Sequence, residues 1–238
     1  MSGMSLESFR RRSVAVVFGA GGGIGGALVE LLRSADHFEQ VIGFSRRSSP
    51  AIDLLDEASL ENATAFAATR GELRLLMDAT GFLHDERQGP EKSWRQLDAA
   101  KLARAFALNA IGPALIMKHV LPLLPRTSKA VFATLSARVG SIGDNRLGGW
   151  YAYRASKAAL NQLVRTAAVE LARRAPEALC IALHPGTVAT QLSAPFAATG
   201  LEVHTPLEAA RHLLGVADGL TAEASGGFFD WRGQPVPW

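Results

Sequence analysis

The chain has 238 residues, 48% of them hydrophobic and 20% charged, a balance typical of a globular protein with a sizeable core. Its net charge is only +3 and its basic residues are dispersed, which argues against a nucleic-acid partner. The single cysteine, Cys180, excludes an intramolecular disulfide and fits a reducing compartment, so we expect a cytoplasmic protein. Neither cysteine nor histidine recurs at metal-ligand spacing, and no metal site is predicted.

The first predicted element is a strand at residues 13–18, followed by a glycine-rich turn and a helix. Its β-branched apolar residues are typical of a strand buried on both faces. Such a turn lets a pyrophosphate approach the backbone at a helix N-terminus, although it also occurs without a ligand. Six glycines interrupt the apolar run and no cleavage pattern follows it, so neither a membrane span nor a targeting segment is expected.

The second predicted strand, residues 40–45, is followed directly by Arg46 and Arg47. In dinucleotide-binding folds an acidic residue about 20 positions beyond the glycines binds the ribose 2′-hydroxyl, whereas an arginine accommodates a 2′-phosphate. Arg46 lies 21 residues after Gly25, and no acid occupies the strand end. This position favours NADP(H) over NAD(H), unless the two arginines are simply solvated.

The remaining elements alternate along the chain. We expect a very short extended element at 52–54, helices at 56–67, 98–124, 151–174 and 205–218, and strands at 73–77, 130–135, 178–183 and 227–231. This alternation predicts an α/β protein, a single Rossmann domain over residues 1–238, with a doubly wound parallel sheet of about seven strands and helices on both faces. Residues 191–204 have no clean period and form the candidate substrate loop.

Two helices carry candidate chemistry. Asn109 lies in the apolar face of the 98–124 helix, where a buried amide must find partners, so it is either a structural clamp or a site residue. Tyr153 and Lys157 are four residues apart and share one face of the 151–174 helix. A nearby cation lowers the pKa of a phenol toward values suited to acid–base catalysis. The same spacing also occurs by chance in an ordinary amphipathic helix.

Five motifs occur in a fixed order: Gly19, Gly23 and Gly25; Asp-Ala-Thr-Gly at 78–81; Asn109; Tyr153 with Lys157; and Pro-Gly-x-Val-x-Thr at 185–190. Together they resemble the short-chain dehydrogenase/reductase superfamily over essentially the whole chain. The nearest likeness is to its branch of C-factor-like proteins and carbonyl reductases.

The resemblance implies an NADP(H)-dependent oxidoreductase that acts on a small carbonyl or alcohol, assembled as a homodimer or homotetramer. It implies that the catalytic residues are Tyr153, Lys157, Asn109 and Ser136. It implies that the cofactor contacts Gly19, Gly21, Gly23, Ile24, Gly25, Ser45, Arg46, Asp53, Leu54, Ala79, Thr80, Gly81, Tyr153, Lys157, Pro185, Gly186, Val188 and Thr190.

Two departures from the family pattern bear on function. Ala137 stands three residues before Gly140, where the family has its serine, so either Ser136 or Ser141 replaces that donor or neither does. Asp78 puts a carboxylate where the family has an asparagine. A nucleotide-binding signalling protein with little turnover, as in the C-factor-like branch, therefore stays open as the alternative function. A hydrolase is disfavoured because the chain lacks a Gly-x-Ser-x-Gly elbow.

Overall fold

The computed structural model describes residues 6–85, 89–193 and 202–238, and its central feature is a parallel sheet. The strands are β1 (Val14–Phe18), β2 (Gln40–Phe44), β3 (Leu73–Asp78), β4 (Ala130–Leu135), β5 (Ala178–His184), β6 (Thr187–Val188), β7 (Val203–His204) and β8 (Phe228–Asp230). The α-helices are α1 (Gly23–Ser34), α2 (Glu57–Ala68), α3 (Ala99–Phe106), α4 (Gly112–Val120), α5 (Tyr151–Arg174) and α6 (Pro206–Gly219).

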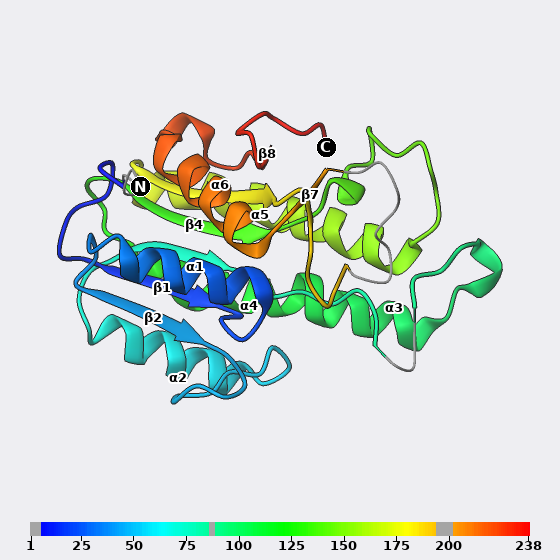
Figure 1. Cartoon of the computed structure of the whole chain (residues 1–238), viewed down its shortest axis with the longest axis horizontal. Coiled ribbons are helices and arrows are strands. Elements are labelled where there is room, and N and C mark those ends of the chain that lie inside the picture. Colours follow the sequence, from blue (N-terminus) through cyan, green and yellow to red (C-terminus); the bar gives the residue numbers. More distant parts are fainter. Residues whose placement is uncertain (1–5, 86–88, 194–201) are drawn as a thin grey trace.

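Six strands form the main sheet in the order β2-β1-β3-β4-β5-β8, and all of its pairs are parallel. The chain leaves β1 toward β2 on one side and returns to β3 on the other, so the strand order switches between β1 and β3 (Figure 1). In open α/β sheets, ligands bind beyond the carboxyl ends of the strands at such a switch point. The glycine turn that follows β1 lies there.

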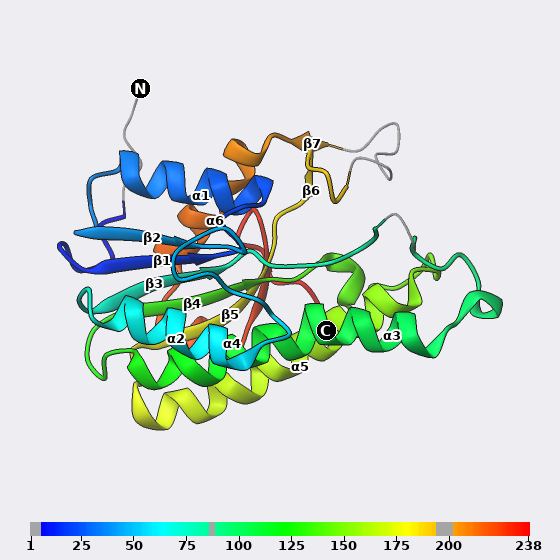
Figure 2. The same ribbon diagram turned by 90° about the horizontal axis from the view of Figure 1, so that it is seen from below.

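Helices cover both faces of the sheet, as Figure 2 shows, with α1 and α6 on one side and α2, α4 and α5 on the other. Alternate residues of β1 enter the two cores, because successive side chains of a strand point to opposite faces. Val16 packs with Leu60 and Leu160 of the α2–α5 side, and Val17 packs with Leu28 of the α1 side. The predicted doubly wound Rossmann fold is confirmed.

The strand count differs slightly from the expectation of about seven. The segment at 52–54 forms no ladder, and the chain passes from β2 through a loop into α2, whose N-cap is Asp56 as predicted. The main sheet of the described residues therefore ends at β2 and has six strands. A separate pair, β6 with β7, lies in the segment that the sequence placed around the substrate loop.

The long helix predicted at 98–124 is divided at Asn109. Residues Ala107–Ile111 form a π-helical turn between α3 and α4, in which the N–H of Gly112 bonds to the carbonyl of Ala107. Pro113 has no N–H to offer the carbonyl of Asn109, so the regular ladder cannot continue there. The stretch Ala99–Leu123 is long and apolar enough to cross a membrane by composition alone, but it packs against α2 and α5 as a core helix of the domain does.

Candidate active site

The glycine turn after β1 lies tightly against the end of β3. Gly19 has a φ of +82°, and a Cβ there would stand 2.8 Å from the carbonyl of Ala79. A Cβ on Gly25 would stand 2.2 Å from the carbonyl oxygen of Gly19. Only glycine therefore fits at these two positions, and the close approach joins the turn to the predicted 79–81 segment.

The same turn also contacts two other predicted cofactor segments. A Cβ on Gly21 would lie 3.3 Å from the Cβ of Ser45, and one on Gly23 would lie 3.0 Å from the Thr190 methyl group. Helix α1 begins beside these contacts with no side-chain cap and no acidic residue in its first turn, while Ile24 packs into the core below. The open N–H groups and the space left by the glycines fit the pyrophosphate of a dinucleotide.

Arg46 lies exposed after β2, next to the half-buried Ser45, and forms no ion pair within the part of the chain that the structure describes. Asp53 is exposed and its Oδ1 accepts the N–H of Leu55 at 2.9 Å. Leu54 packs on α4, where a Cβ on Gly112 would lie 2.8 Å from the Leu54 Cβ. Of these residues, Ser45 contacts the glycine turn, through Gly21, and the adenosine contacts of the others stay predictions.

Lys157 is buried at the centre of the site. Its Nζ donates a hydrogen bond of 2.7 Å to the carbonyl of Leu135 at the end of β4 and lies 6.0 Å from the centroid of the Tyr153 ring. Both Lys157 Nζ and Asn109 Oδ1 lie 3.8 Å from the position that a Cβ on Gly81 would take. The 79–81 segment thus contacts the glycine turn at one end and the candidate catalytic residues at the other.

Burial outweighs any lowering of the Tyr153 pKa by Lys157 in this structure. Burial raises the pKa of Tyr153 to about 12 and lowers the pKa of Lys157 to about 8, because desolvation disfavours the charged form of each group. The ammonium bonds to Leu135, and the Tyr153 ring packs edge-on against Trp150 with centroids 6.2 Å apart. Tyr153 is therefore a protonated phenol at neutral pH.

Asn109 acts as a clamp through its side chain. Its Oδ1 accepts the N–H of Phe82 at 2.7 Å, and its Nδ2 donates to the Phe82 carbonyl at 2.7 Å and to Ser156 Oγ at 3.1 Å. Ser156 in turn donates to the carbonyl of Tyr153. The amide is fully buried and ties the segment after β3 to helix α5, so its side chain holds the site together while its backbone carbonyl lies in the π-helical turn.

The Ser136 hydroxyl is turned toward helix α5, and its catalytic role stays a prediction. Its hydroxyl is buried and donates to Asn161 Oδ1 at 2.7 Å, one helical turn beyond Lys157. Ser141 is buried as well, and its Oγ accepts the N–H of Asp144 at 3.1 Å. Ala137 is extended and half-buried, and successive side chains of an extended segment point to opposite faces. Neither serine therefore takes the position that Ala137 occupies.

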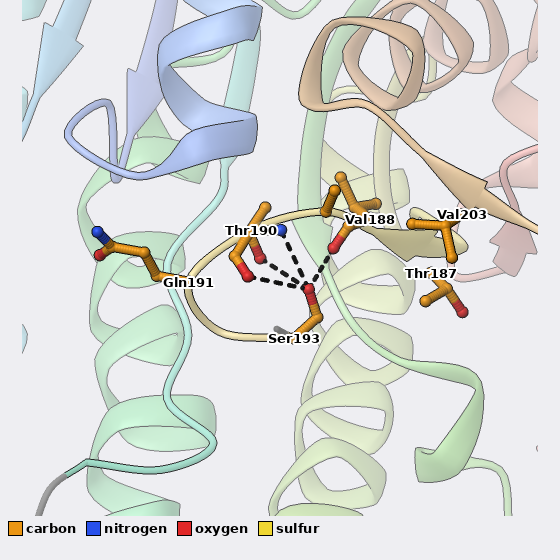
Figure 3. Close-up of a pocket in the computed structure, with 7 residues that line it drawn as sticks. Thr187, Val188, Thr190, Gln191, Ser193 and Val203 are labelled. Carbon is orange, nitrogen blue, oxygen red and sulfur yellow. Dashed lines mark hydrogen bonds between the residues drawn. The ribbon is translucent and has the colours of Figure 1, made fainter. Parts of the chain in front are cut away.

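The segment after β5 forms a pocket of about 470 Å³ lined by Thr187, Val188, Ala189, Thr190, Gln191, Ser193 and Val203 (Figure 3). The hydroxyl of Ser193 bonds to the N–H and hydroxyl of Thr190 and to the carbonyl of Val188, which closes the 188–193 turn. Pro185 and Gly186 precede it, with Gly186 at a φ of +80° against His204 and Trp231. Tyr153 and Lys157 do not line this pocket, which adjoins the glycine turn through Thr190. Residues 194–201 of the predicted substrate loop lie outside the described residues.

Glu91 and Arg154, which no sequence motif marked, hold the start of α5. Trp150 precedes the helix in the left-handed region at φ +53°, and no side chain of its own caps the helix. Instead, Glu91 Oε2 accepts the N–H of Ala152 at 3.1 Å, and the guanidinium of Arg154 donates to the carbonyls of Val139, Gly148 and Gly149. Leu-Gly-Gly-Trp lacks an N-cap residue, which indicates that the cap comes from elsewhere in the chain, but this pattern does not identify Glu91 as the partner.

Histidine, cysteine and carboxylate side chains form no group of three that could hold a metal ion within the described ranges, and the absence of a metal stays a prediction. The nicotinamide dinucleotide fits better, since the glycines leave the space and α1 supplies unpaired N–H groups.

Comparisons with known proteins agree with this geometry. A short-chain dehydrogenase family model, described as enoyl-(acyl carrier protein) reductase, matches residues 27–214. The C-signal protein of Myxococcus xanthus is 41% identical over 142 residues, covering 60% of this chain and 81% of that protein. The 1-hydroxy-2-glutathionyl-2-methyl-3-butene dehydrogenase of Rhodococcus sp. (strain AD45) is 33% identical over 190 residues, 79% of each chain.

Among solved structures, the NADPH-bound carbonyl reductase from chicken fatty liver superimposes with a TM-score of 0.81 at 27% identity, covering 97% of this chain and 100% of that one. The matched model spans most of the chain, and the aligned structure spans nearly all of it. The chain therefore belongs to the short-chain dehydrogenase/reductase superfamily, a family of oxidoreductases.

Proposed function

We propose that the protein is an NADP(H)-dependent oxidoreductase that interconverts a small carbonyl compound and its alcohol. One observation carries the proposal: the 79–81 segment contacts both the glycine turn, through Ala79 and Gly19, and the candidate acid–base pair, through Gly81 and Lys157. A dinucleotide held by the turn would thus extend toward Tyr153. The NADPH-bound carbonyl reductase among the structural relatives supports the same cofactor class.

On this proposal Tyr153 is the proton donor in reduction. When bound, the nicotinamide supplies or accepts the hydride. Tyr153, whose pKa burial raises to about 12, stays protonated at neutral pH and so can give its proton to the carbonyl oxygen as negative charge develops there. Lys157 lies beside the ring and would stabilise the phenolate that remains. Asn109 keeps Phe82 and helix α5 in register around this pair.

A second function is favoured by one specific feature. Ala137 stands where the resemblance leads us to expect a serine hydroxyl, and the hydroxyls of Ser136 and Ser141 bond to Asn161 and to the N–H of Asp144. Loss of an oxyanion donor costs roughly 10²–10³ in rate. A nucleotide-binding signalling protein with little turnover would tolerate that loss, and the C-signal protein is a relative.

The test begins with fluorescence titrations of the full chain with NADPH and NADH, followed by turnover on a panel of aldehydes and ketones. We expect micromolar or tighter binding of NADPH and measurable reduction that Tyr153→Phe abolishes without weakening cofactor binding. Binding with no turnover in the wild type, unchanged by Tyr153→Phe, would support the signalling function. Failure to bind either cofactor would contradict both proposals.

The preference for NADP(H) is assigned to Arg46. Arg46 is exposed and directly follows Ser45, which lies against Gly21 of the glycine turn, so its guanidinium could pair with a 2′-phosphate. We expect Arg46→Ala to weaken NADPH binding about tenfold or more, the value of one lost charge-assisted contact, while NADH binding changes little. Arg47→Ala is the matched control, because Arg47 is equally exposed one residue further on. Equal losses for both cofactors would show that Arg46 does not select the phosphate.

We also propose that the chain forms a homodimer or homotetramer through α4 and α5. A groove of about 410 Å³ runs between these helices, with Ala114, Leu121, Leu163 and Ala167 among its lining residues. Leu163 is 37% exposed although it is apolar, as expected for a face that a second copy covers. Sedimentation of the wild type and of Leu163→Glu tests this, and a monomeric wild type would refute it. The cytoplasmic location stays a prediction.

A further inference from the structure

Asp78 is a buried carboxylate in a position that the family fills with a neutral amide. It ends β3, is 0% exposed, and pairs in register with Thr134 of β4. Its Oδ1 accepts the N–H of Thr80 at 3.0 Å and the Thr80 hydroxyl at 2.6 Å, and its Oδ2 accepts the Thr134 hydroxyl at 2.7 Å. Four lone-pair sites on the carboxylate are thus met by three neutral donors.

Neutral donors do not compensate the burial of a full charge. An asparagine would satisfy the same three groups, since its Oδ1 can keep both bonds to Thr80 and its Nδ2 can donate to the Thr134 hydroxyl. A carboxylate in this place adds only charge, which costs several kcal/mol to bury unless an opposite charge lies near. Burial raises the pKa of Asp78, and the positive charge that acts against this rise is Lys157, which bonds to Leu135, the residue next to Thr134.

The reverse holds for Lys157. Its Nζ is buried with the Leu135 carbonyl as its hydrogen-bond partner, and desolvation disfavours its charged form. Its acceptor Leu135 lies between Thr134 and Ser136, which are neutral. Neutral Asn109 approaches the same Gly81 position as Lys157, and the Tyr153 phenol lies on the same helix.

Arg138 lies on the neighbouring turn, Arg138–Gly140, and forms an exposed ion pair with Asp144. Asp78 of β3 is linked to Lys157 through neighbouring residues, since it bonds to Thr134 and Lys157 bonds to Leu135; desolvation lowers the pKa of Lys157 to about 8, and the charge of Asp78 acts against that lowering.

We propose that Asp78 is the charge partner of Lys157, and that its carboxylate keeps the buried ammonium protonated at neutral pH. Asp78 is then a positioning residue for the acid–base pair, and its catalytic consequence rests on the proposed function. The carboxylate has a second effect through Thr80, because it fixes the turn that leads to Gly81 beside Lys157. One side chain thus sets both the charge of the lysine and the shape of the loop against it.

The direct test is an NMR titration of the ¹³Cε resonances of the lysines in the cofactor-free full chain. The chain has five lysines, and Lys157→Arg identifies the resonance of interest. We expect Asp78→Asn to lower the titration midpoint of Lys157 by about half a pH unit or more, because the ammonium loses its compensating charge. Asp144→Asn is the matched control, since it removes an exposed carboxylate that pairs with Arg138, and it should leave the midpoint in place.

An unchanged or higher midpoint in Asp78→Asn would overturn the proposal. If that variant does not fold, Asp78→Ser serves as the second variant, because a hydroxyl can still bond to Thr80, and the same downward shift is expected. The second readout is the pH dependence of alcohol oxidation, whose rising limb should move to higher pH in Asp78→Asn as the phenolate of Tyr153 loses a neighbouring cation. A shifted NMR midpoint without any turnover would support the charge pair while contradicting the proposed oxidoreductase, and turnover with an unshifted midpoint would do the reverse.

Discussion

Glu91 lies outside the family motifs and caps the start of helix α5. Trp150 adopts a left-handed backbone and gives the helix no side-chain cap, so the first free N–H groups are met from elsewhere. Glu91 supplies two acceptors: its carbonyl takes the N–H of Trp150, and its Oε2 takes the N–H of Ala152. Glu91→Ala keeps the carbonyl and removes the carboxylate alone.

The magnitude follows from three parts of that contact. Loss of an N-terminal cap costs about 1 kcal/mol. A carboxylate at a partly buried helix N-terminus adds about 0.5–1 kcal/mol through the helix dipole. Ala152 is only 7% exposed, so its N–H is left without a partner at about 1 kcal/mol or more. The desolvation of Glu91 itself offsets part of this sum, which leaves about 2 kcal/mol of destabilisation.

Thermal denaturation monitored by circular dichroism measures this loss. For a chain of this size 1 kcal/mol corresponds to about 2–4 °C, so Glu91→Ala should melt about 4–8 °C below the wild type. Glu91→Gln keeps an acceptor oxygen and should lose less than half of that. Lys92→Ala, on the exposed neighbouring residue, is the control and should melt like the wild type. A Glu91→Ala protein that melts within about 1 °C of the wild type would refute the capping argument.

Two further outcomes follow from the site. Ala137→Ser should raise kcat/KM for carbonyl reduction by up to about 10²-fold, because it restores a hydroxyl on the face opposite Ser136. Ser136→Ala should lower the melting temperature with little effect on kcat, since the Ser136 hydroxyl bonds to Asn161. The reverse pattern in steady-state kinetics would show that Ser136 is the donor. Burial lowers the pKa of His184 to about 4, below its usual 6.5, so the folded state holds this ring neutral and stability present above pH 6.5 is lost as the pH falls toward 4. Urea denaturation between pH 7 and 4 should show this loss, and His184→Gln should flatten the slope; an equal slope in both proteins would exclude His184 as its source.

The parts of the fold that the sequence predicted are those that local patterns determine. A strand buried on both faces and a helix with a 3.6-residue period need no information from elsewhere, and the glycine turn needs only its own steric limits. The break in the 98–124 helix also has a local cause, because Pro113 lacks an N–H, and the π-helical turn falls just before Gly112-Pro113 and includes Asn109. The short element at 52–54 was counted toward the sheet but pairs with no strand in the part of the chain that the structure describes, and its few residues carried too little pattern to decide.

The features that could not be predicted are contacts between distant segments. Glu91 reaches Ala152 across 61 positions, and its carboxylate looks from the sequence like any surface glutamate. Ser136 has the right residue type one position from the family's serine, and only its rotation toward Asn161 shows that it serves a different partner. The prediction of a lowered Tyr153 pKa failed for the same reason. The sequence gives the spacing of the phenol and the ammonium, but not the burial that raises the pKa of the phenol.

On the proposed mechanism, the two departures from the family pattern, Ala137 and Asp78, both affect the proton transfer from Tyr153. Without a hydroxyl at Ala137, the proposed mechanism has Tyr153 as the donor that meets the developing oxyanion among the described residues, so the rate depends more heavily on how well its phenolate is stabilised. In that mechanism the charge of Lys157 stabilises the phenolate, and the carboxylate of Asp78 favours the charged form of this buried lysine. If so, Asp78→Asn should cost more activity in the Ala137 background than beside a restored serine. Equal losses in Asp78→Asn and in the Asp78→Asn, Ala137→Ser double variant would show that the two sites act independently.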